Sequence, residues 1–395
     1  MWSRFTRFLP DVFSYTAVAL AHYYLYVWLM RSERMGRLPN RSLRLVQAAF
    51  AASLIFVWVG ISLQIPGVTR MLPYSGWQIW GRGLAIAYGM TICMLFLVAF
   101  VGRWVIGMMP PSQPMDPMRR NALKAGVGAA LAAPFAITGF GIIVERQRFV
   151  LKELEIGIPN LPKDLQGLRL VQLTDMHISP FLTVKELARA VDMANEAKAH
   201  VTLVTGDLIT SPGDPLDACI RELSRLRADA GVFGCMGNHE IYARSEDYTA
   251  RQAGRYGMRF LRQESQILRF GKASLNLAGV DYQRFGEIYL PDAGGLISSE
   301  SQTLNVLLSH NPDVFPVAAN QGWDLTLAGH THGGQVTFEL LSRQLNIARF
   351  FTKYVQGHYK LGGRSIFVSR GLGTVGVPAR IGAPPEVAVI KLCAT

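Results

Sequence analysis

Hydrophobic residues follow two different patterns along the chain. In the first part they form four long uncharged stretches, at residues 12–30, 45–65, 83–102 and 125–144. A helix needs about 20 apolar residues to cross the ~30 Å hydrocarbon core of a bilayer, and each stretch is close to that length. The pattern therefore predicts a membrane anchor over residues 1–150, with about four transmembrane helices.

From about residue 151 short apolar runs alternate with amphipathic stretches. A capping box, Thr183-x-x-Glu186, predicts the start of a helix over 183–198, and Asp214 is the expected N-cap of another helix over 215–227. The predicted strands are 168–173, 201–204, 232–236, 304–308, 325–328, 365–368 and 387–392. Alternating strands and helices predict an α/β domain over residues 151–395, with a site at the carboxyl ends of the strands.

The net charge of +12 is distributed unevenly between these two parts. Residues 1–150 hold 15 Lys and Arg against 4 Asp and Glu, whereas residues 151–395 hold 25 against 24. The second part is therefore almost neutral, which argues against a basic nucleic-acid groove there. None of the four apolar stretches contains Lys, Arg, Asp or Glu. Transporters usually place such groups at membrane depth, so an anchor is favoured over a transporter.

Polar motifs directly follow five of the predicted strands. In chain order they are Thr174-Asp175-Met176-His177, Gly206-Asp207, Gly237-Asn238-His239-Glu240, Ser309-His310-Asn311 and Gly329-His330-Thr331-His332. Carboxylates and imidazoles without thiolates suit divalent ions such as Mn, Zn or Fe. Asp175 and His177 can face one ion, as can His330 and His332, and the two carboxylate oxygens of Asp207 can bridge two ions. The ordered set predicts a metal site.

These motifs resemble the calcineurin-like metallophosphoesterase superfamily, in its bacterial membrane-anchored branch. The resemblance covers the chain from about Leu168 onward and includes Gly329-His330-Thr331-His332-Gly333-Gly334-Gln335. It implies an α/β sandwich of two mixed sheets flanked by helices. It also implies two divalent metal ions (Mn, Zn, Fe or Mg), the first held by Asp175, His177, Asp207 and His332. The second would be held by Asp207, Asn238, His310 and His330, with His239 as the catalytic residue near the leaving group.

The resemblance and the anchor together predict a membrane-anchored two-metal phosphoesterase. Such an enzyme hydrolyses phosphoester or pyrophosphate bonds with a metal-activated hydroxide. The expected partners are a phosphoester substrate, with lipid-linked phosphates as candidates, and the lipid bilayer; no nucleic acid is expected. The alternative is a membrane sensor or binding module that captures phosphate-bearing ligands without turnover.

Loop charges predict a multi-pass protein of the bacterial inner membrane. Five arginines against one glutamate follow the first stretch within residues 31–44, so this loop is expected in the cytoplasm. After four crossings, the catalytic domain would lie on the periplasmic or extracellular face. The fourth stretch is open to two interpretations, because residues 118–124 resemble a twin-arginine export signal. If residues 125–144 do not cross, the domain faces the cytoplasm.

Overall fold

The computed structural model describes the chain except residues 1, 64–74, 109–115, 284–289, 291–292 and 341–342. The chain divides into two compact units, Met1–Gly141 with Gly376–Pro378, and Ile142–Val375 with Ala379–Thr395. The first unit is helical. Its helices are α1 (Trp2–Met30), α2 (Glu33–Gly36), α3 (Asn40–Ser62), α5 (Gly76–Met108) and α6 (Pro117–Ile143), which ends at the start of the second unit.

Three of the described helices are long and apolar enough to span a membrane: Asn40–Gly60, Gly76–Met108 and Pro117–Gln147. The first predicted stretch, 12–30, is helical in α1 but is not among these three. The side chains of α1 are described from Tyr15 onward, which leaves fewer residues than a membrane span needs. The last two residues of the predicted stretch 45–65 lie outside the described residues. The number of membrane crossings therefore stays a prediction.

Polar side chains inside this unit hydrogen-bond between helices. His22 of α1 lies 3.3 Å from the hydroxyl of Ser53 in α3. Thr91 of α5 donates to the Thr138 hydroxyl of α6 at 2.9 Å. Polar groups in an apolar environment require such pairing, because water is not available there as a hydrogen-bond partner.

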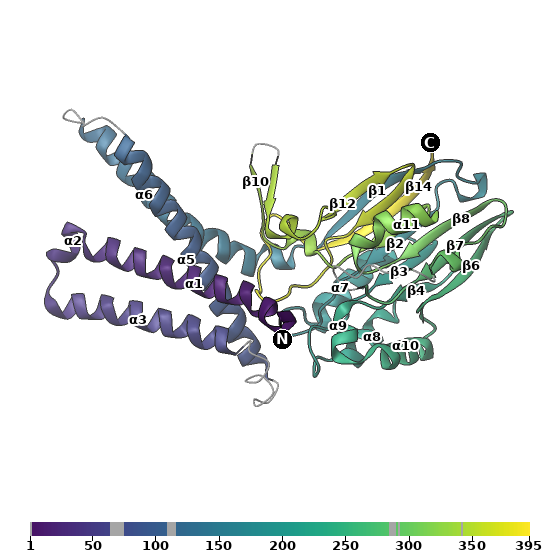
Figure 1. The fold of residues 1–395 in the computed structure, drawn as a ribbon, viewed down its shortest axis with the longest axis horizontal. Helices are drawn as coiled ribbons and strands as arrows, with labels where there is room; N and C mark the ends of the chain where they lie inside the picture. The colour runs from purple at the N-terminus through teal and green to yellow at the C-terminus, as the bar shows by residue number, and fades with distance from the viewer. Residues whose placement is uncertain (1, 64–74, 109–115, 284–289, 291–292, 341–342) are drawn as a thin grey trace. The chain divides into compact units, whose positions relative to one another are not determined.

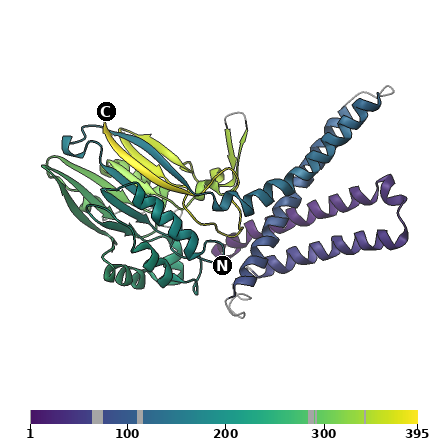
Figure 2. The same ribbon diagram turned by 180° about the vertical axis from the view of Figure 1, so that it is seen from behind.

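The second unit is built on two six-stranded mixed sheets (Figures 1 and 2). The first sheet has the order β1 (Val150–Ile158), β14 (Glu386–Ala394), β2 (Arg169–Leu173), β3 (Val201–Thr205), β4 (Val232–Cys235), β5 (Arg259–Phe260). The second has the order β12 (Gly357–Leu361), β13 (Arg364–Val368), β9 (Leu325–Ala328), β8 (Thr303–Leu308), β7 (Ala273–Gly279), β6 (Glu264–Phe270). A separate hairpin joins β10 (Thr337–Leu340) to β11 (Arg343–Asn346).

Alternating side chains along the strands place the two sheets face to face. In β2, Leu170 belongs to the core between the sheets, whereas its neighbour Val171 belongs to the core under the helices. Ala388 and Val389 of β14 divide in the same way. This alternation is the period of two that a strand covered on both faces requires. The structure confirms the predicted α/β class, with two mixed sheets flanked by helices.

Helices cover the outer faces of both sheets. The apolar sides of α7 (Val184–Glu196), α8 (Leu216–Leu223) and α10 (Glu246–Arg255) pack in the same core as the outer face of the first sheet, and α11 (Phe315–Gln321) packs with the second. The predicted capping box of Thr183 and Glu186 is present at α7. The remaining short helices are α9 (Asn238–Ala243), η1 (Glu145–Gln147), η2 (Lys163–Leu165), η3 (Gly294–Leu296), η4 (Pro312–Val314), η5 (His332–Gly334) and η6 (Ile347–Phe350).

Candidate metal centre

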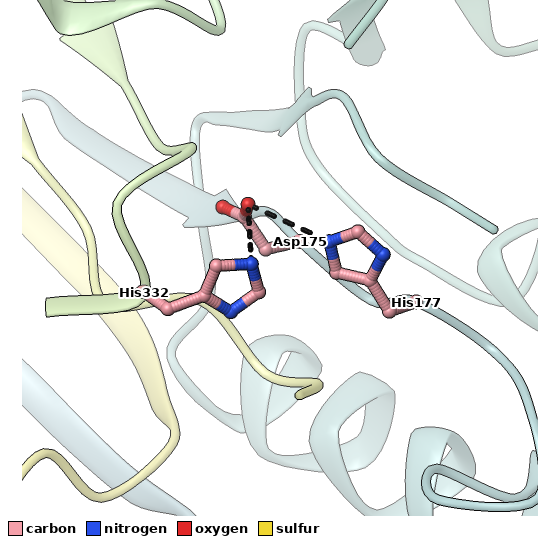
Figure 3. Close-up of side chains that lie close together, drawn as sticks. All are labelled: Asp175, His177 and His332. Carbon is pink, nitrogen blue, oxygen red and sulfur yellow. Dashed lines mark ion pairs between the residues drawn. The ribbon is translucent and has the colours of Figure 1, made fainter. Parts of the chain in front are cut away.

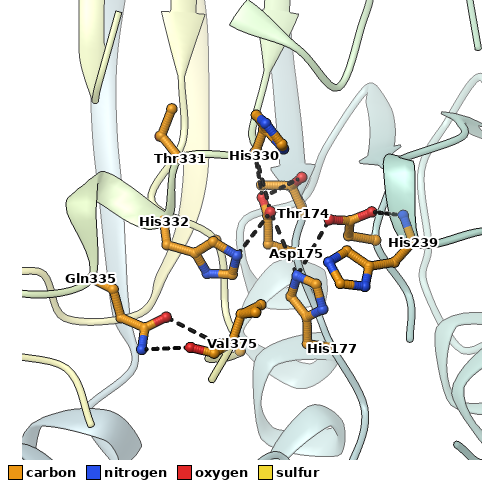
Figure 4. A network of polar contacts seen from close by, with 12 residues as sticks. Thr174, Asp175, His177, His239, His330, Thr331, His332, Gln335 and Val375 are labelled. Atoms are coloured by element: carbon orange, nitrogen blue, oxygen red, sulfur yellow. Dashed lines mark hydrogen bonds and ion pairs between the residues drawn. The ribbon is translucent and has the colours of Figure 1, made fainter. Parts of the chain in front are cut away.

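The predicted motifs follow five strands that run in parallel within their sheets. Strands β2, β3 and β4 are mutually parallel, as are β8 and β9. Their carboxyl ends therefore lie at one edge of the sandwich, and the side chains that follow them converge there (Figure 4). The structure brings Asp175, His177, Asp207, His239, His310, His330 and His332 into overlapping groups of three.

The backbone at this edge is unusual. Asp175, His177, Asp207, His330 and His332 all have left-handed φ angles, between 46° and 74°. L-residues rarely adopt this conformation, and Asp and His tolerate it better than most. Hydrogen bonds between loops hold it: the Asp175 N–H donates to the Gly206 carbonyl and the His177 N–H to the Asp207 carbonyl, each at 3.0 Å.

One group consists of Asp175, His177 and His332, whose candidate ligand atoms lie within 4.8 Å of one another. Asp175 Oδ1 is 3.3 Å from His332 Nε2 and 3.9 Å from His177 Nε2 (Figure 3). All three residues are buried. The opposite side of the Asp175 carboxylate accepts the Thr174 hydroxyl at 2.9 Å, and the His330 N–H donates to it at 3.0 Å. These bonds fix the orientation of the carboxylate.

A second group consists of Asp207, His310 and His330. Asp207 Oδ2 is 3.0 Å from His310 Nε2 and 3.4 Å from His177 Nε2, so one carboxylate oxygen faces histidines of both groups. Asp207 is thus positioned between the two groups. Asn238 begins α9 and is buried, and its Oδ1 has no hydrogen-bond partner among the described residues.

The unpartnered buried atoms fit a metal site. His177 Nε2 and His310 Nε2 lack hydrogen-bond partners within the described part of the chain. Buried polar atoms usually have partners, so unsatisfied ones at one edge need an explanation. The Nδ1 of His310 is 2.7 Å from the Thr205 carbonyl, which fixes Nδ1 as a donor and leaves Nε2, which faces Asp207, as the atom that would bind a metal. Oxygen and imidazole donors without sulfur match borderline or hard divalent ions.

Burial and opposite charge set the proton affinities in the metal-free chain. Burial raises the pKa of Asp175. Burial would also raise the pKa of Asp207, but the charge of His310 and the close contacts of His177 and His310 together outweigh burial and hold that pKa well below its usual value. Burial disfavours protonated His310, yet Asp207 and Asp175 raise its pKa to about 10. Burial lowers the pKa of His330 to about 3. A proton on His310 therefore occupies the place of a cation, and a metal must displace it.

His239 is held differently from the other histidines. Its Nδ1 donates to the Thr210 carbonyl at 2.6 Å, and its N–H donates to Asp207 Oδ1 at 2.9 Å. Its ring is half-buried, and burial lowers its pKa to about 4. The ring also lies close enough to His177 and Asp207 to join them in a group of three. Its geometry alone allows either a ligand or a residue that faces the substrate.

The sequence did not reveal the groups that brace these loops. The fully buried Glu240 carboxylate accepts the N–H groups of Asp207, Leu208 and Gly237 at 2.7–2.9 Å. It therefore anchors the Asp207 loop, whereas the ring of its neighbour His239 is held by the Thr210 carbonyl. A side chain at Gly237 would collide with the Asp207 carboxylate, which explains the glycine. A glutamate three residues after the glycine that precedes α9 was the available signal, because a carboxylate at that position can accept the glycine N–H.

Arg380 braces the other side of the centre. It is fully buried and donates to the carbonyls of His332, Arg370, Gly371, Gly373 and Ala383 at 2.6–3.4 Å. The Gly373 N–H in turn donates to the Asp175 carbonyl at 2.7 Å. Arg380 thereby holds the loop after β13 against both ligand loops of the first group. No local sequence pattern marks it.

A tyrosine ring lies beside the second group. The Tyr282 ring centroid is 5.3 Å from that of His330 and 6.1 Å from that of His310. Tyr242 lies 6.5 Å from Tyr282 and 5.9 Å from His239, and 59% of its surface is exposed. Burial raises the pKa of Tyr282, so its hydroxyl stays protonated at neutral pH.

Comparison with known proteins matches this site to a family. The model of the calcineurin-like phosphoesterase family matches residues 168–334, which include every candidate ligand. The metallophosphoesterase YkuE of Bacillus subtilis is 30% identical over 291 residues, covering 71% of this chain and all of that protein. The chain belongs to the calcineurin-like metallophosphoesterases. It is therefore a metal-dependent phosphoric ester hydrolase, of a family that typically binds two divalent ions.

Two further relatives are a transmembrane protein and a phosphodiesterase. A transmembrane protein with metallophosphoesterase domain from Danio rerio is 26% identical, covering 78% of each chain. Phosphodiesterase YaeI of Escherichia coli is 27% identical, covering 57% of this chain and 82% of that protein. The apolar helices and the transmembrane relative together indicate that this metallophosphoesterase associates with a membrane.

Proposed function

We propose that the chain is a membrane-anchored phosphodiesterase with a two-metal centre. The observation that carries the proposal is the position of Asp207 between two ligand groups, facing His177 at 3.4 Å and His310 at 3.0 Å. Asp175, His177, Asp207 and His332 would hold one ion. Asp207, Asn238, His310 and His330 would hold the other. The name of the relative phosphodiesterase YaeI supports a diester substrate.

Two bound divalent ions would supply Lewis acidity, which lowers the pKa of water and offsets phosphoryl charge. The protein residues do the positioning. Asp207 and Asp175 provide the negative charge that holds two cations close together, and Thr174 and Glu240 keep the ligand loops rigid. We assign His239 to the leaving group, because its Nδ1 bond to Thr210 fixes the ring and leaves Nε2 for the substrate.

The membrane part of the proposal rests on the apolar helices and the transmembrane relative. An enzyme held at a bilayer meets lipids at high local concentration, so lipid-linked phosphoesters are the proposed substrates. The loop charges favour the inner membrane of a bacterium with the catalytic unit on the periplasmic or extracellular face. The rival function is capture of a phosphate compound without turnover. It would use the same metal-binding residues but would not require His239, because no leaving group departs.

The test is a substrate panel on the full chain purified in detergent, with metal content measured in parallel. We expect hydrolysis of bis(p-nitrophenyl) phosphate, loss of activity with a chelator, and recovery with Mn²⁺. His358→Ala serves as a histidine control, because His358 lies in β12 and contacts Ser365, outside the centre. Binding of phosphate without turnover of any ester would support the rival function. Undiminished turnover after confirmed metal loss would contradict the mechanism.

A further inference from the structure

Residues 345–351, which run from the end of β11 through η6, expose an unusual set of apolar side chains. Phe350 is 87% exposed, Ile347 70%, Phe351 60% and Leu345 52%. Leu345 lies in β11, Ile347 and Phe350 lie in η6, and Phe351 follows η6. The hairpin of β10 and β11 projects from the sheets of the second unit (Figure 1). Single exposed apolar residues are normal on a soluble surface, but four within seven consecutive residues mark an interaction site.

Hydrogen bonds hold this segment in place. The Asn346 side chain caps η6 by accepting the Arg349 N–H at 3.1 Å. Farther along, the Thr352 hydroxyl donates to Asp313 at 2.5 Å, and the Tyr354 N–H donates to Thr352 at 3.0 Å. The backbone between these anchors is therefore fixed by its own contacts. These contacts therefore hold Phe350 and Phe351 in their exposed orientation.

Both ends of the segment are joined to the loop of the first ligand group. The Asn346 side chain lies against Gly334, where an added Cβ would approach it within 2.7 Å. The Thr331 hydroxyl donates to the Val355 carbonyl at 2.5 Å. Thr331 lies between the candidate ligands His330 and His332. A surface that bound residues 347–351 would thus be held close to the metal loop.

The charged side chains of the segment itself are all basic. Arg349 and Lys353 are exposed, and the sequence from 345 to 361 contains no Asp or Glu. Exposed aromatic side chains together with Lys or Arg are the signature of segments that lie in the headgroup region of a bilayer. Basic side chains there are attracted by anionic lipids, and salt weakens the attraction.

We propose that Ile347, Phe350 and Phe351, flanked by Arg349 and Lys353, form a lipid-docking surface for anionic bilayers. The inference rests on the membrane anchoring proposed above, because the anchor keeps a bilayer within reach. Docking orients the metal loop toward the headgroup layer. The metal centre then acts on phosphoesters that remain embedded in the membrane, without extracting them.

The test places an environment-sensitive fluorophore on Phe350→Cys in the full chain, reconstituted in phosphatidylcholine–phosphatidylglycerol vesicles that contain a spin-labelled quencher lipid. Tyr256→Cys is the matched control, because Tyr256 is 48% exposed at the end of α10. Labelling of the native cysteines is measured on the unsubstituted chain and subtracted. We expect strong quenching at position 350 and little at 256, with quenching at 350 reduced in pure phosphatidylcholine or at high salt.

A second readout uses Ile347→Ser, Phe350→Ser and Phe351→Ser combined. Hydrolysis of a vesicle-embedded phosphodiester should fall ~10-fold or more, because apolar contact with the interface is lost. Hydrolysis of the water-soluble diester should stay unchanged, which would show that the proposed activity is intact.

Equal quenching at positions 350 and 256 in vesicle-bound chain would overturn the docking surface alone. Burial of the 350 label in detergent through chain dimers would overturn it in favour of a second copy. Failure of the full chain to float with vesicles would overturn both the anchoring and the docking.

Discussion

Replacement of Glu240 by alanine tests whether this carboxylate holds the Asp207 loop. The change leaves the buried N–H groups of Asp207, Leu208 and Gly237 without their present acceptor. Each unsatisfied buried donor costs about 1–3 kcal/mol. Water entering the vacated space would recover part of this, so we take about 1 kcal/mol for each donor. The expected loss of stability is about 3 kcal/mol, or a fall in melting temperature of roughly 6–12 °C for a unit of this size.

The assay is thermal unfolding of the full chain in detergent, with bound metal measured on the same samples. Glu264→Ala is the matched control, because Glu264 forms an exposed ion pair with Arg259 that is worth at most about 1 kcal/mol. Glu240→Gln supplies one acceptor oxygen and should melt between the wild type and Glu240→Ala. If Glu240→Ala melted at the same temperature as Glu264→Ala and kept its metal, the Glu240 carboxylate would not be what holds the Asp207 loop.

Three further predictions concern ligands, bracing and topology. Asp207→Asn should lose both metals, whereas His239→Ala should keep metal content and slow turnover by about 10²–10⁴; equal metal loss in the two variants would make His239 a ligand. Arg380→Lys keeps the charge but not the planar set of donors, so metal affinity should fall by about 10–100-fold, measured by competition with a chelator; unchanged affinity would refute the bracing role. A phosphatase reporter fused after Thr395 should be active and a fluorescent protein that folds only in the cytoplasm should be dark; the reverse pattern would place the catalytic unit in the cytoplasm.

Local sequence patterns predicted most of the central strands because these strands are short and covered on both faces, but they missed β7, in which Ser274 and Asn276 interrupt the apolar residues. The strand predicted at 325–328 matches β9 and that at 201–204 ends one residue short of β3. Edge elements were missed: β6 is half-exposed and β10–β11 forms its own hairpin, so neither has a continuous apolar run. The N-cap assigned to Asp214 is wrong. Its carboxylate accepts the Thr210 and Ser211 N–H groups of the preceding turn, and Pro215 is the N-cap of α8.

The candidate ligands could be predicted because each directly follows an apolar strand, and parallel strands bring their carboxyl ends together. The bracing groups could not be predicted in the same way. Arg380 contacts carbonyls of residues from His332 to Ala383, and Tyr282 meets His310 and His330 only through the fold. Such partners share no spacing in the sequence. Their roles depend on which loops the two sheets bring together.

Because the candidate ligands have a left-handed backbone, their geometry must be held either by the bound metals or by contacts within the protein. Five of the seven candidate ligands have this conformation, which costs of order 1 kcal/mol or more for each residue. The bonds from Asp175 to Gly206 and from His177 to Asp207 tie the loop after β2 to the loop after β3, so each loop fixes the other without an ion. We therefore expect the chelated chain to keep its secondary structure and a cooperative unfolding transition, at a temperature lowered only by the lost binding free energy. Calorimetry of the chelated and Mn²⁺-loaded chain in detergent measures this difference. Loss of the cooperative transition on chelation would show that the metals, and not the backbone contacts, impose the geometry.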